Sequence, residues 1–389
     1  NLRTPGPTPI PPDVREAQSR QMVDHRGTEF AELLRETSAG LAELIGTSDE
    51  VLLLTGSGSG ALEAAIVNTL SPDDRVLSVN IGSFGDRFAK TARAFGAEVE
   101  TLDFEWGSAA DAATLDEHLQ ANDPYRAVLV THNETSTGVA NPLRELADAV
   151  RIAPGGPLLL VDGISGLGAM PFEMDAWGID LVVSASQKAW MASPGIAIAA
   201  VGERARHAET EARMPRFYWD FAEARQWSGK GQTPWTPAIT VLYGLQVGVR
   251  RLRAEGRERT WARHAAIAQG VAAGLESLGL RLVAAPAARP ATVTAAWLPE
   301  HIEWSPFNAA MRARGLVIAG GQGKWSGKIL RFGHMGEVGI NEMAEALEIM
   351  GGVLREFGHG TDAAAAGRAA RETYEAHAAS EAAAGVSVG

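Results

Sequence analysis

Seven short β-rich runs lie between residues 50 and 202, and helical patterns separate most of them. In the intervening segments, apolar residues recur at spacings of three and four, as expected for helices that pack on a sheet. The runs are VLLLT (51–55), RVLSVN (75–80), EVETLDF (98–104), AVLVTH (127–132), LLLVDG (158–163), DLVVSAS (180–186) and GIAIAAVG (195–202). This alternation predicts an α/β sandwich with a largely parallel, seven-stranded sheet, whose functional groups should lie at the carboxyl ends of the strands.

The remainder of the chain predicts a second, smaller unit. Residues 203–240 hold many aromatic and turn residues, which indicates a long ordered excursion. A long helical stretch over 239–278 follows, and then four runs (LRLVAA, ATVTAAWLP, LVIAGG and KILRFGHMG) alternate with helical segments. We expect an N-terminal arm over 1–20, a large domain over 21–254, a small α+β domain over 255–358 and an alanine-rich tail over 359–389. The tail either docks as a helix or frays.

The composition excludes several classes of function. A formal net charge of -12 and the lack of any Lys or Arg run argue against nucleic-acid binding. The chain has no cysteine, so disulfides, thiolate metal sites and thiol nucleophiles are excluded, and no metal site is expected. No apolar run approaches the ~18–20 residues of a membrane helix. A cytoplasmic protein of 389 residues with two ordinary cores is therefore expected.

A glycine-rich loop, Gly56-Ser57-Gly58-Ser59-Gly60, connects the first run to a helical segment. Its backbone N–H groups and the helix dipole converge on one point that suits a phosphate, although a tight turn without a ligand is an alternative. A P-loop would need Gly-Lys-Ser/Thr, but alanine and leucine follow Gly60. A dinucleotide site would need an acidic residue where Asn80 ends the next strand. A single phosphate, such as that of pyridoxal phosphate, needs only the loop and its hydroxyls.

Pyridoxal phosphate also requires a lysine, and the chain has five: Lys90, Lys188, Lys230, Lys324 and Lys328. The first falls inside a helical pattern, and the last three lie in polar, glycine-rich loops. Lys188 instead follows the run DLVVSAS, at the carboxyl end of a predicted strand. An amine that attacks a carbonyl must be neutral, and partial burial at this position would lower its pKa as required. A structural lysine with its stem along apolar surface is the alternative.

Three further residues could act with this lysine. Asp162 ends an apolar strand, where its carboxylate could keep a pyridine nitrogen protonated; a helix N-cap is the alternative. Thr135, in the run HNETSTG, could reach the cofactor or the substrate, or belong to a simple polar loop. Arg331 lies in an apolar strand, and a buried arginine needs a partner. That partner is either a substrate carboxylate, bound in a bidentate manner, or a structural salt bridge.

In this chain order, the motifs resemble fold-type I pyridoxal-phosphate enzymes, and most closely the class V aminotransferases of the alanine–glyoxylate and serine–glyoxylate group. His132-Asn133-Glu134, Tyr218-Trp219-Asp220 and Leu242-Tyr243-Gly244-Leu245 look most like serine–glyoxylate aminotransferases. The resemblance runs from Pro5-Gly6-Pro7-Thr8 to Gly336, through His25-Arg26, Gly82-Ser83-Phe84-Gly85, HNETSTG, LLLVDGIS, Ser186-Gln187-Lys188, Thr233-Pro234-Trp235-Thr236-Pro237 and RFGHMG. It implies transfer of an amino group between a small amino acid and a small oxo acid.

The resemblance also implies roles for residues at matching positions. Lys188 would be the Schiff-base lysine and the acid/base, Asp162 would bind the pyridine nitrogen, and Thr135 would lie near the phenolic oxygen or the substrate. Phe84 stands where the family often has a ring-stacking tryptophan, and phenylalanine still stacks. The substrate carboxylate would be held by Arg331 and the Gly6 loop. Ser57, Gly58, Ser59, Gln187, Thr233 and Thr236 would bind the cofactor. Because Thr236 would reach the phosphate in the other subunit, a homodimer is implied.

The sequence alone does not identify the two substrates. Pocket shape decides between serine and alanine as donor and between glyoxylate and pyruvate as acceptor. Cysteine desulfuration is excluded, because it needs an enzyme cysteine. Lyase-type chemistry with the same cofactor and a catalytically inactive binding protein on the same scaffold are the alternatives to transamination.

Overall fold

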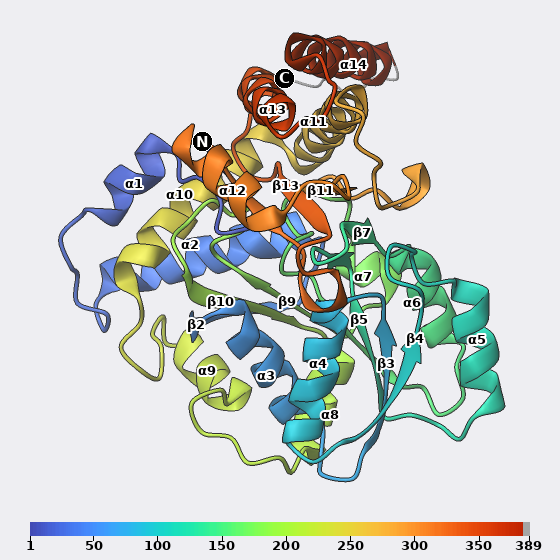
Figure 1. The fold of residues 1–389 in the computed structure, drawn as a ribbon. Coiled ribbons are helices and arrows are strands. Elements are labelled where there is room, and N and C mark those ends of the chain that lie inside the picture. Colours follow the sequence, from blue (N-terminus) through green and yellow to red (C-terminus); the bar gives the residue numbers. More distant parts are fainter. Residues whose placement is uncertain (384–389) are drawn as a thin grey trace.

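The computed structural model describes residues 1–383, and a seven-stranded sheet forms its centre (Figure 1). The strands are β2 (Glu50–Gly56), β3 (Arg75–Asn80), β4 (Glu98–Asp103), β5 (Ala127–Thr131), β8 (Leu158–Asp162), β9 (Leu181–Ala185) and β10 (Gly195–Val201). Their order is β2-β10-β9-β8-β5-β3-β4, and β10 runs antiparallel to both of its neighbours while the other pairs are parallel. The predicted largely parallel, seven-stranded sheet is confirmed.

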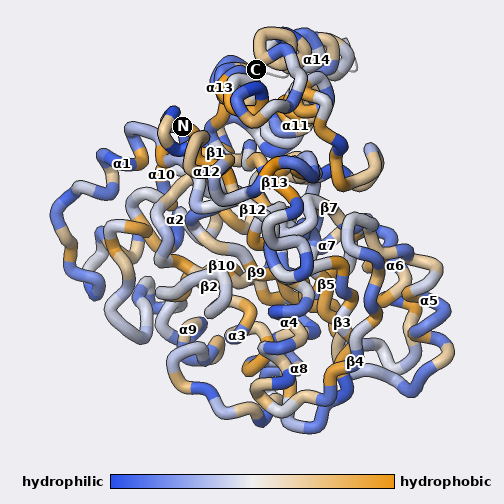
Figure 2. The backbone as a smooth tube through the Cα atoms, viewed as in Figure 1, coloured by the Kyte–Doolittle hydropathy of each residue, from blue (hydrophilic) through white to orange (hydrophobic). Residues whose placement is uncertain are grey.

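Helices cover both faces of this sheet, which explains why its strands are almost continuously apolar. Leu53 points into the core on one face, and its neighbours Leu52 and Leu54 point into the core on the other. The first face is covered by α2 (Thr28–Ile45), α5 (Ala112–Ala121), α6 (Leu143–Arg151) and α10 (Ile239–Glu255), and α1 (Pro12–Gln18) packs on α10. The second face is covered by α3 (Gly58–Thr69), α4 (Ser83–Ala94), α8 (Glu203–Glu211) and α9 (Phe221–Ser228). In Figure 2, hydrophobic residues (orange) lie along the central strands, and hydrophilic residues (blue) recur along the helices that cover them.

A four-stranded sheet lies beside this sandwich, in the order β1-β12-β13-β11. Its strands are β1 (Leu2–Arg3), β11 (Val293–Trp297), β12 (Val317–Gly320) and β13 (Ile329–Gly333). Because β1 pairs parallel to β12, the first residues of the chain are joined to its C-terminal part. The helices here are α11 (Arg257–Ser277), α12 (Trp304–Ala313), α13 (Ile340–Glu356) and α14 (Ala363–Ala383).

The tail docks as a helix over its described part. Helix α14 packs along α11 and α13, and Ala366 and Ala370 are fully buried there. The last part of the predicted tail, 384–389, lies outside the described residues. No helix in the described chain is long and apolar enough to cross a membrane.

Three details differ from the sequence-based expectations. The helical stretch over 239–278 is two helices, because Gly256 between them has a φ of +87°. The run LRLVAA makes a single β-bridge, from Leu282 to Ala296, and no strand. The excursion over 203–240 contains α8 and α9. The short elements that complete the fold are β6 (Asn133–Glu134), β7 (Val139–Ala140), α7 (Met174–Trp177) and the 3-10 turns at Pro286–Ala288 and Gly323–Trp325.

Candidate active site

A cavity of about 170 Å³ opens at the carboxyl ends of β2, β5, β8 and β9. Four predicted regions meet there, because parallel strands of one sheet end at the same edge. The lining residues are Ser57, Gly58, Ser59, Leu62, Phe84, Arg87, Asn133, Thr135, Asp162, Ile164, Ser165, Gln187 and Lys188. The structure therefore brings together eight of the predicted site residues: Ser57, Gly58, Ser59, Phe84, Thr135, Asp162, Gln187 and Lys188.

Lys188 lies three residues beyond β9, with its side chain facing the cavity. Its Nζ donates a hydrogen bond of 2.5 Å to the carbonyl oxygen of Pro5, in the N-terminal arm. Loss of hydration lowers the pKa of Lys188 to about 8, and the negative charge of Asp162 opposes this shift. The neutral, nucleophilic amine is therefore accessible near physiological pH.

The Gly6 loop closes directly over this amine. Gly6 has a φ of +124°, and a Cβ at this position would lie 2.5 Å from Nζ of Lys188. A side chain would thus both strain the backbone and collide with the lysine. The arm, predicted to contribute to the site, contacts it through Pro5 and Gly6.

Asp162 is the last residue of β8 and is 3% exposed. Burial raises the pKa of its carboxyl group to about 7, while the hydrogen bond from the backbone N–H of Ile164 to Oδ1 acts in the opposite direction. A buried carboxylate of this kind is stabilised by a cationic or proton-bearing partner. Lys188 contributes in that sense, since its positive charge lowers the pKa of Asp162.

Glu134 joins two segments of the site, the start of α4, which carries Phe84, and the turn that carries Thr135. Its Oε2 accepts hydrogen bonds from the backbone N–H groups of Phe84 (2.9 Å) and Gly85 (3.1 Å), in the first turn of α4. Its Oε1 accepts from the N–H and the hydroxyl of Ser136. Burial raises the pKa of Glu134, and these donors oppose the shift. The fully buried carboxylate therefore locks the HNETSTG turn onto the N-terminus of α4.

Arg331 lies on β13 and is 5% exposed. Its Nε donates to the carbonyl oxygen of Gly320 (2.7 Å) and its Nη1 donates to that of Thr135 (2.9 Å). Within residues 1–383 no carboxylate forms an ion pair with it, so the structural salt bridge considered as an alternative is not formed. Burial lowers the pKa of Arg331 to about 10. This guanidinium, fixed beside Thr135, is suited to an anionic partner.

Comparisons with known proteins agree with this geometry. The family model "Aminotransferase class-V" matches residues 5–330. The chain belongs to the class V aminotransferase family.

Three curated relatives align over nearly the whole length. A protein named soluble hydrogenase small subunit, from Synechococcus, is 37% identical over 95% of this chain and 96% of its own. An L-aspartate–glyoxylate aminotransferase of Paracoccus denitrificans is 34% identical over 96% of each, and a serine–glyoxylate aminotransferase of Hyphomicrobium methylovorum is 35% identical over 94% and 93%.

A solved structure supports the same assignment. The ureidoglycine–glyoxylate aminotransferase of Bacillus subtilis superposes with a TM-score of 0.90 at 28% identity, covering 96% of this chain and 97% of that one. The predicted family, the fold-type I architecture and an aminotransferase activity are thereby confirmed. Class V aminotransferases in general depend on pyridoxal phosphate.

The cavity of this aminotransferase suits that cofactor. Ser57 is the N-cap of α3, and its hydroxyl oxygen accepts a hydrogen bond from the backbone N–H of Gly60. The glycine-rich loop therefore lies at the N-terminus of a 12-residue helix, which is a favourable position for an anion. Two buried oxygens of cavity residues, Oε1 of Gln187 and Oδ1 of Asn133, have no hydrogen-bond partner among residues 1–383. Unpaired buried polar atoms of this kind are costly unless a ligand or water satisfies them. The walls contributed by Phe84 and Ile164 are apolar, as an aromatic ring requires.

Two predicted cofactor residues lie elsewhere in the aminotransferase chain. Thr233 is buried, and its hydroxyl donates to the carbonyl oxygen of Trp235 (2.7 Å). Thr236 is exposed at the surface. Neither lines the cavity around Lys188 of its own chain, so their binding of a cofactor stays a prediction that requires a second subunit.

The sequence interpretation missed Arg87 and Asn133, both of which line the cavity. Asn133 donates through Nδ2 to Ser165 and to the hydroxyl of Thr292 (2.5 Å), and thus ties the large sheet to the smaller one. No short-range pattern reveals that contact. Arg87, by contrast, follows Phe84 by three residues in a helical pattern, a spacing that places both side chains on one face.

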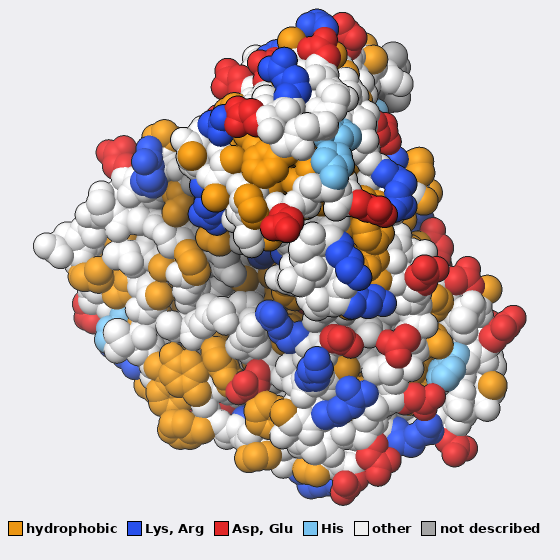
Figure 3. All heavy atoms as spheres, in the orientation of Figure 1, with side chains coloured by type: hydrophobic (Ala, Val, Ile, Leu, Met, Phe, Trp, Pro, Cys, Tyr) orange, Lys and Arg blue, Asp and Glu red, His pale blue; other side chains and the backbone are white. Residues whose placement is uncertain are grey.

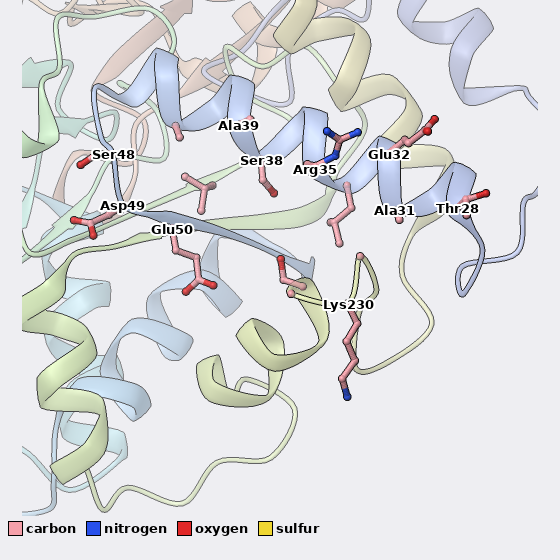
Figure 4. Close-up of a pocket in the computed structure, with 16 residues that line it drawn as sticks. Thr28, Ala31, Glu32, Arg35, Ser38, Ala39, Ser48, Asp49, Glu50 and Lys230 are labelled. Atoms are coloured by element: carbon pink, nitrogen blue, oxygen red, sulfur yellow. The ribbon is translucent and has the colours of Figure 1, made fainter.

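A wider hollow of about 680 Å³ lies between α2, the start of β2 and residues 228–231 (Figure 4). Two of its three acidic residues, Asp49 and Glu50, pair with Arg206 and Arg225. It adjoins the opposite end of β2 from Gly56, so it is separate from the edge at which Lys188 and Asp162 meet.

Proposed function

We propose that this class V aminotransferase uses pyridoxal phosphate bound at Lys188 to transfer an amino group from a small L-amino acid, serine or alanine, to a small 2-oxo acid, glyoxylate or pyruvate. The observation that carries the proposal is the pairing of a lysine of lowered pKa with a buried carboxylate in one cavity, beside a loop suited to phosphate. The glyoxylate aminotransferases among the relatives support the choice of acceptor.

The bound cofactor supplies an electron sink, which makes the α-proton of an attached amino acid acidic. Lys188 would hold the cofactor through its Nζ, and as a free amine it would accept the proton from the α-carbon of the substrate and later return it. A pKa of about 8 leaves this amine able to accept a proton near neutral pH. Asp162 would hold the ring nitrogen in its protonated form, because its buried carboxylate favours a proton-bearing partner.

Arg331 holds the carboxylate of the substrate. Two of its nitrogens are fixed by Gly320 and Thr135, so the guanidinium orientation is set before any substrate arrives. Its link to the backbone of Thr135 couples the carboxylate site to the wall of the cofactor cavity. The positive charge of Arg331 also helps to lower the pKa of Lys188, so the two groups lie near enough for one small substrate to meet both.

The proposed functional unit is a homodimer in which Thr236 of one subunit completes the cofactor site of the other. Phe217 (76% exposed) and Tyr218 (43% exposed) form an aromatic cluster with Trp235, at ring distances of 4.9 and 5.7 Å from the tryptophan. Figure 3 shows hydrophobic side chains gathered on the surface near α9, the helix that follows these two residues. Exposed aromatic residues beside Thr236 are typical of a protein interface.

The direct test is a half-reaction. The purified protein, saturated with pyridoxal phosphate, is mixed with L-serine, L-alanine or L-aspartate without an acceptor, and the absorbance spectrum and the released oxo acid are measured. Transamination predicts loss of the visible cofactor band, one equivalent of the corresponding oxo acid per site, and recovery of the band on addition of glyoxylate or pyruvate. Rapid reaction with serine or alanine supports the proposed donors.

Other outcomes contradict the proposal. Multiple turnovers of amino acid without an acceptor would indicate lyase-type chemistry. A protein that takes up the cofactor but leaves every donor unchanged would be an inactive binding protein. Faster reaction with aspartate than with serine or alanine would refute the donor assignment and retain transamination.

A further inference from the structure

Arg87 occupies a position between the two segments that enclose one end of the cavity. It lies in the first part of α4, one turn after Phe84, and its guanidinium carbon is 4.8 Å from the centre of the Phe84 ring. Its Nη1 donates to the hydroxyl of Ser59, at 3.5 Å. The side chain thus joins α4 to the loop that precedes α3, and it faces the same cavity as Lys188.

In the part of the chain that the structure describes, no carboxylate forms an ion pair with Arg87, although its charge opposes the rise in the pKa of the buried Asp162. Its recorded contacts are a neutral hydroxyl and an aromatic ring. The neighbouring acidic residue, Asp86, instead accepts a hydrogen bond from Asn80. The basic residues that line the cavity are Arg87 and Lys188, and the amine of Lys188 is assigned to the carbonyl group of the cofactor. Arg87 is therefore available for a second, anionic group.

The loop of residues 57–60 offers only neutral donors. Serine hydroxyls, backbone N–H groups and the dipole of α3 stabilise an anion, but none carries a full charge. A phosphate ester carries between one and two negative charges near pH 7. A guanidinium matches the geometry of phosphate oxygens with two parallel N–H donors.

We propose that Arg87 binds the phosphate group of the cofactor together with Ser59, and so determines selectivity for the phosphorylated form of the cofactor. This inference rests on the proposed function, since it assumes that pyridoxal phosphate occupies the cavity. In this proposal Arg87 contributes to the affinity for the cofactor, and Lys188 carries out the proton transfers. Because Arg87 is exposed to solvent, we expect a moderate effect of its removal, roughly ten- to a hundredfold in affinity.

The test compares two ligands that differ only in the phosphate. Dissociation constants for pyridoxal phosphate and for pyridoxal are measured with cofactor-free protein, from the visible absorbance band and the quenching of tryptophan fluorescence. The variants are Arg87→Met, Arg87→Lys and the matched control Lys90→Met. Lys90 is an exposed cation on the same helix, one turn further along, and does not line the cavity.

We expect Arg87→Met to weaken pyridoxal phosphate binding roughly ten- to a hundredfold and to leave pyridoxal binding within about twofold. Arg87→Lys should lose less, and Lys90→Met should bind both ligands as the unaltered protein does. Unchanged affinity for pyridoxal phosphate, or equal losses for both ligands, would overturn the assignment.

If Arg87→Met does not fold, Arg87→Lys and competition by inorganic phosphate decide the question. Phosphate should then inhibit cofactor capture by the unaltered protein at a lower concentration than in Arg87→Lys, and equal inhibition would overturn the assignment. A failure of the premise that the cavity binds this cofactor is distinguishable, because the unaltered protein would then capture neither ligand; a failure of transamination alone appears in the half-reaction and leaves these dissociation constants unchanged.

Discussion

The floor and the rim of the Lys188 cavity are built in different ways. The floor consists of Asp162 and Lys188 at the ends of strands that are buried on both faces, and it is complete within one chain. The rim includes the exposed Arg87, and in the proposed homodimer it is completed by Thr236 of the other subunit, beside the aromatic cluster at Phe217 and Tyr218 that faces solvent in a single chain. The rigid edge of the sheet therefore positions the residues proposed for catalysis. The rim contains the residues proposed for contact with a second subunit and for selectivity between cofactor forms.

The largest effect is expected at the floor. Asp162→Asn should reduce turnover by about two orders of magnitude or more, because a neutral amide no longer keeps the ring nitrogen protonated. Cofactor binding should persist, since the phosphate loop is unaltered. Stopped-flow half-reactions measure the effect. Turnover close to that of the unaltered protein would remove Asp162 from the mechanism.

Arg331→Leu should follow in size. Loss of a buried charge pair with the substrate carboxylate costs about 2–5 kcal/mol, or roughly 30- to 5,000-fold in affinity for L-serine. Ethanolamine, which lacks the carboxylate, serves as the matched ligand and should bind equally to both proteins. Arg331→Lys should restore part of the difference. Equal losses for L-serine and ethanolamine would mean that the hydrogen bonds to Gly320 and Thr135 have a purely structural role.

A smaller effect is expected at the rim, where Thr236→Val should weaken cofactor binding by about 1.5–3 kcal/mol through the loss of one hydrogen bond to a charged group. Mixed dimers identify the subunit on which Thr236 acts. When a Lys188→Ala chain is paired with a Thr236→Val chain, one site should contain both native residues and bind cofactor with full affinity. Weakened binding at that site would place Thr236 in the cavity of its own chain, and a monomeric protein would refute the shared rim altogether.

The smallest effect is a shift along the pH axis. Burial lowers the pKa of Lys188 to about 8, so the rate of cofactor capture should rise with pH and reach half of its maximum near pH 8, against about 10.4 for an exposed lysine. A parallel titration with N-α-acetyl-lysine corrects for ionisation of the cofactor. In Asp162→Asn the midpoint should fall further, because the charge of Asp162 raises the pKa of Lys188. A midpoint near 10 would contradict the buried floor.

The residues of the floor were predictable from the sequence, and the contacts that join the two sheets were not. Apolar runs ending in Asp162, in HNETSTG and shortly before Lys188 identify strand ends, and the sheet then brings them to one edge. The contacts of Arg331 with Thr135 and of Asn133 with Thr292 join residues more than 150 positions apart. Local patterns carry no information on such pairings. The helix break at Gly256 depends on a positive φ, and the failure of LRLVAA to form a strand depends on the pairing available near Ala296.

The most direct test of the central claim is reductive trapping. The protein is saturated with pyridoxal phosphate, reduced with borohydride and digested, and the labelled peptide is located by mass spectrometry, with Lys188→Ala as the control. The account predicts one pyridoxyl group per chain, on Lys188, no label in the control, and loss of the label when the protein is treated with its amino donor before reduction. Label on another lysine, or stoichiometric label in Lys188→Ala, would contradict it.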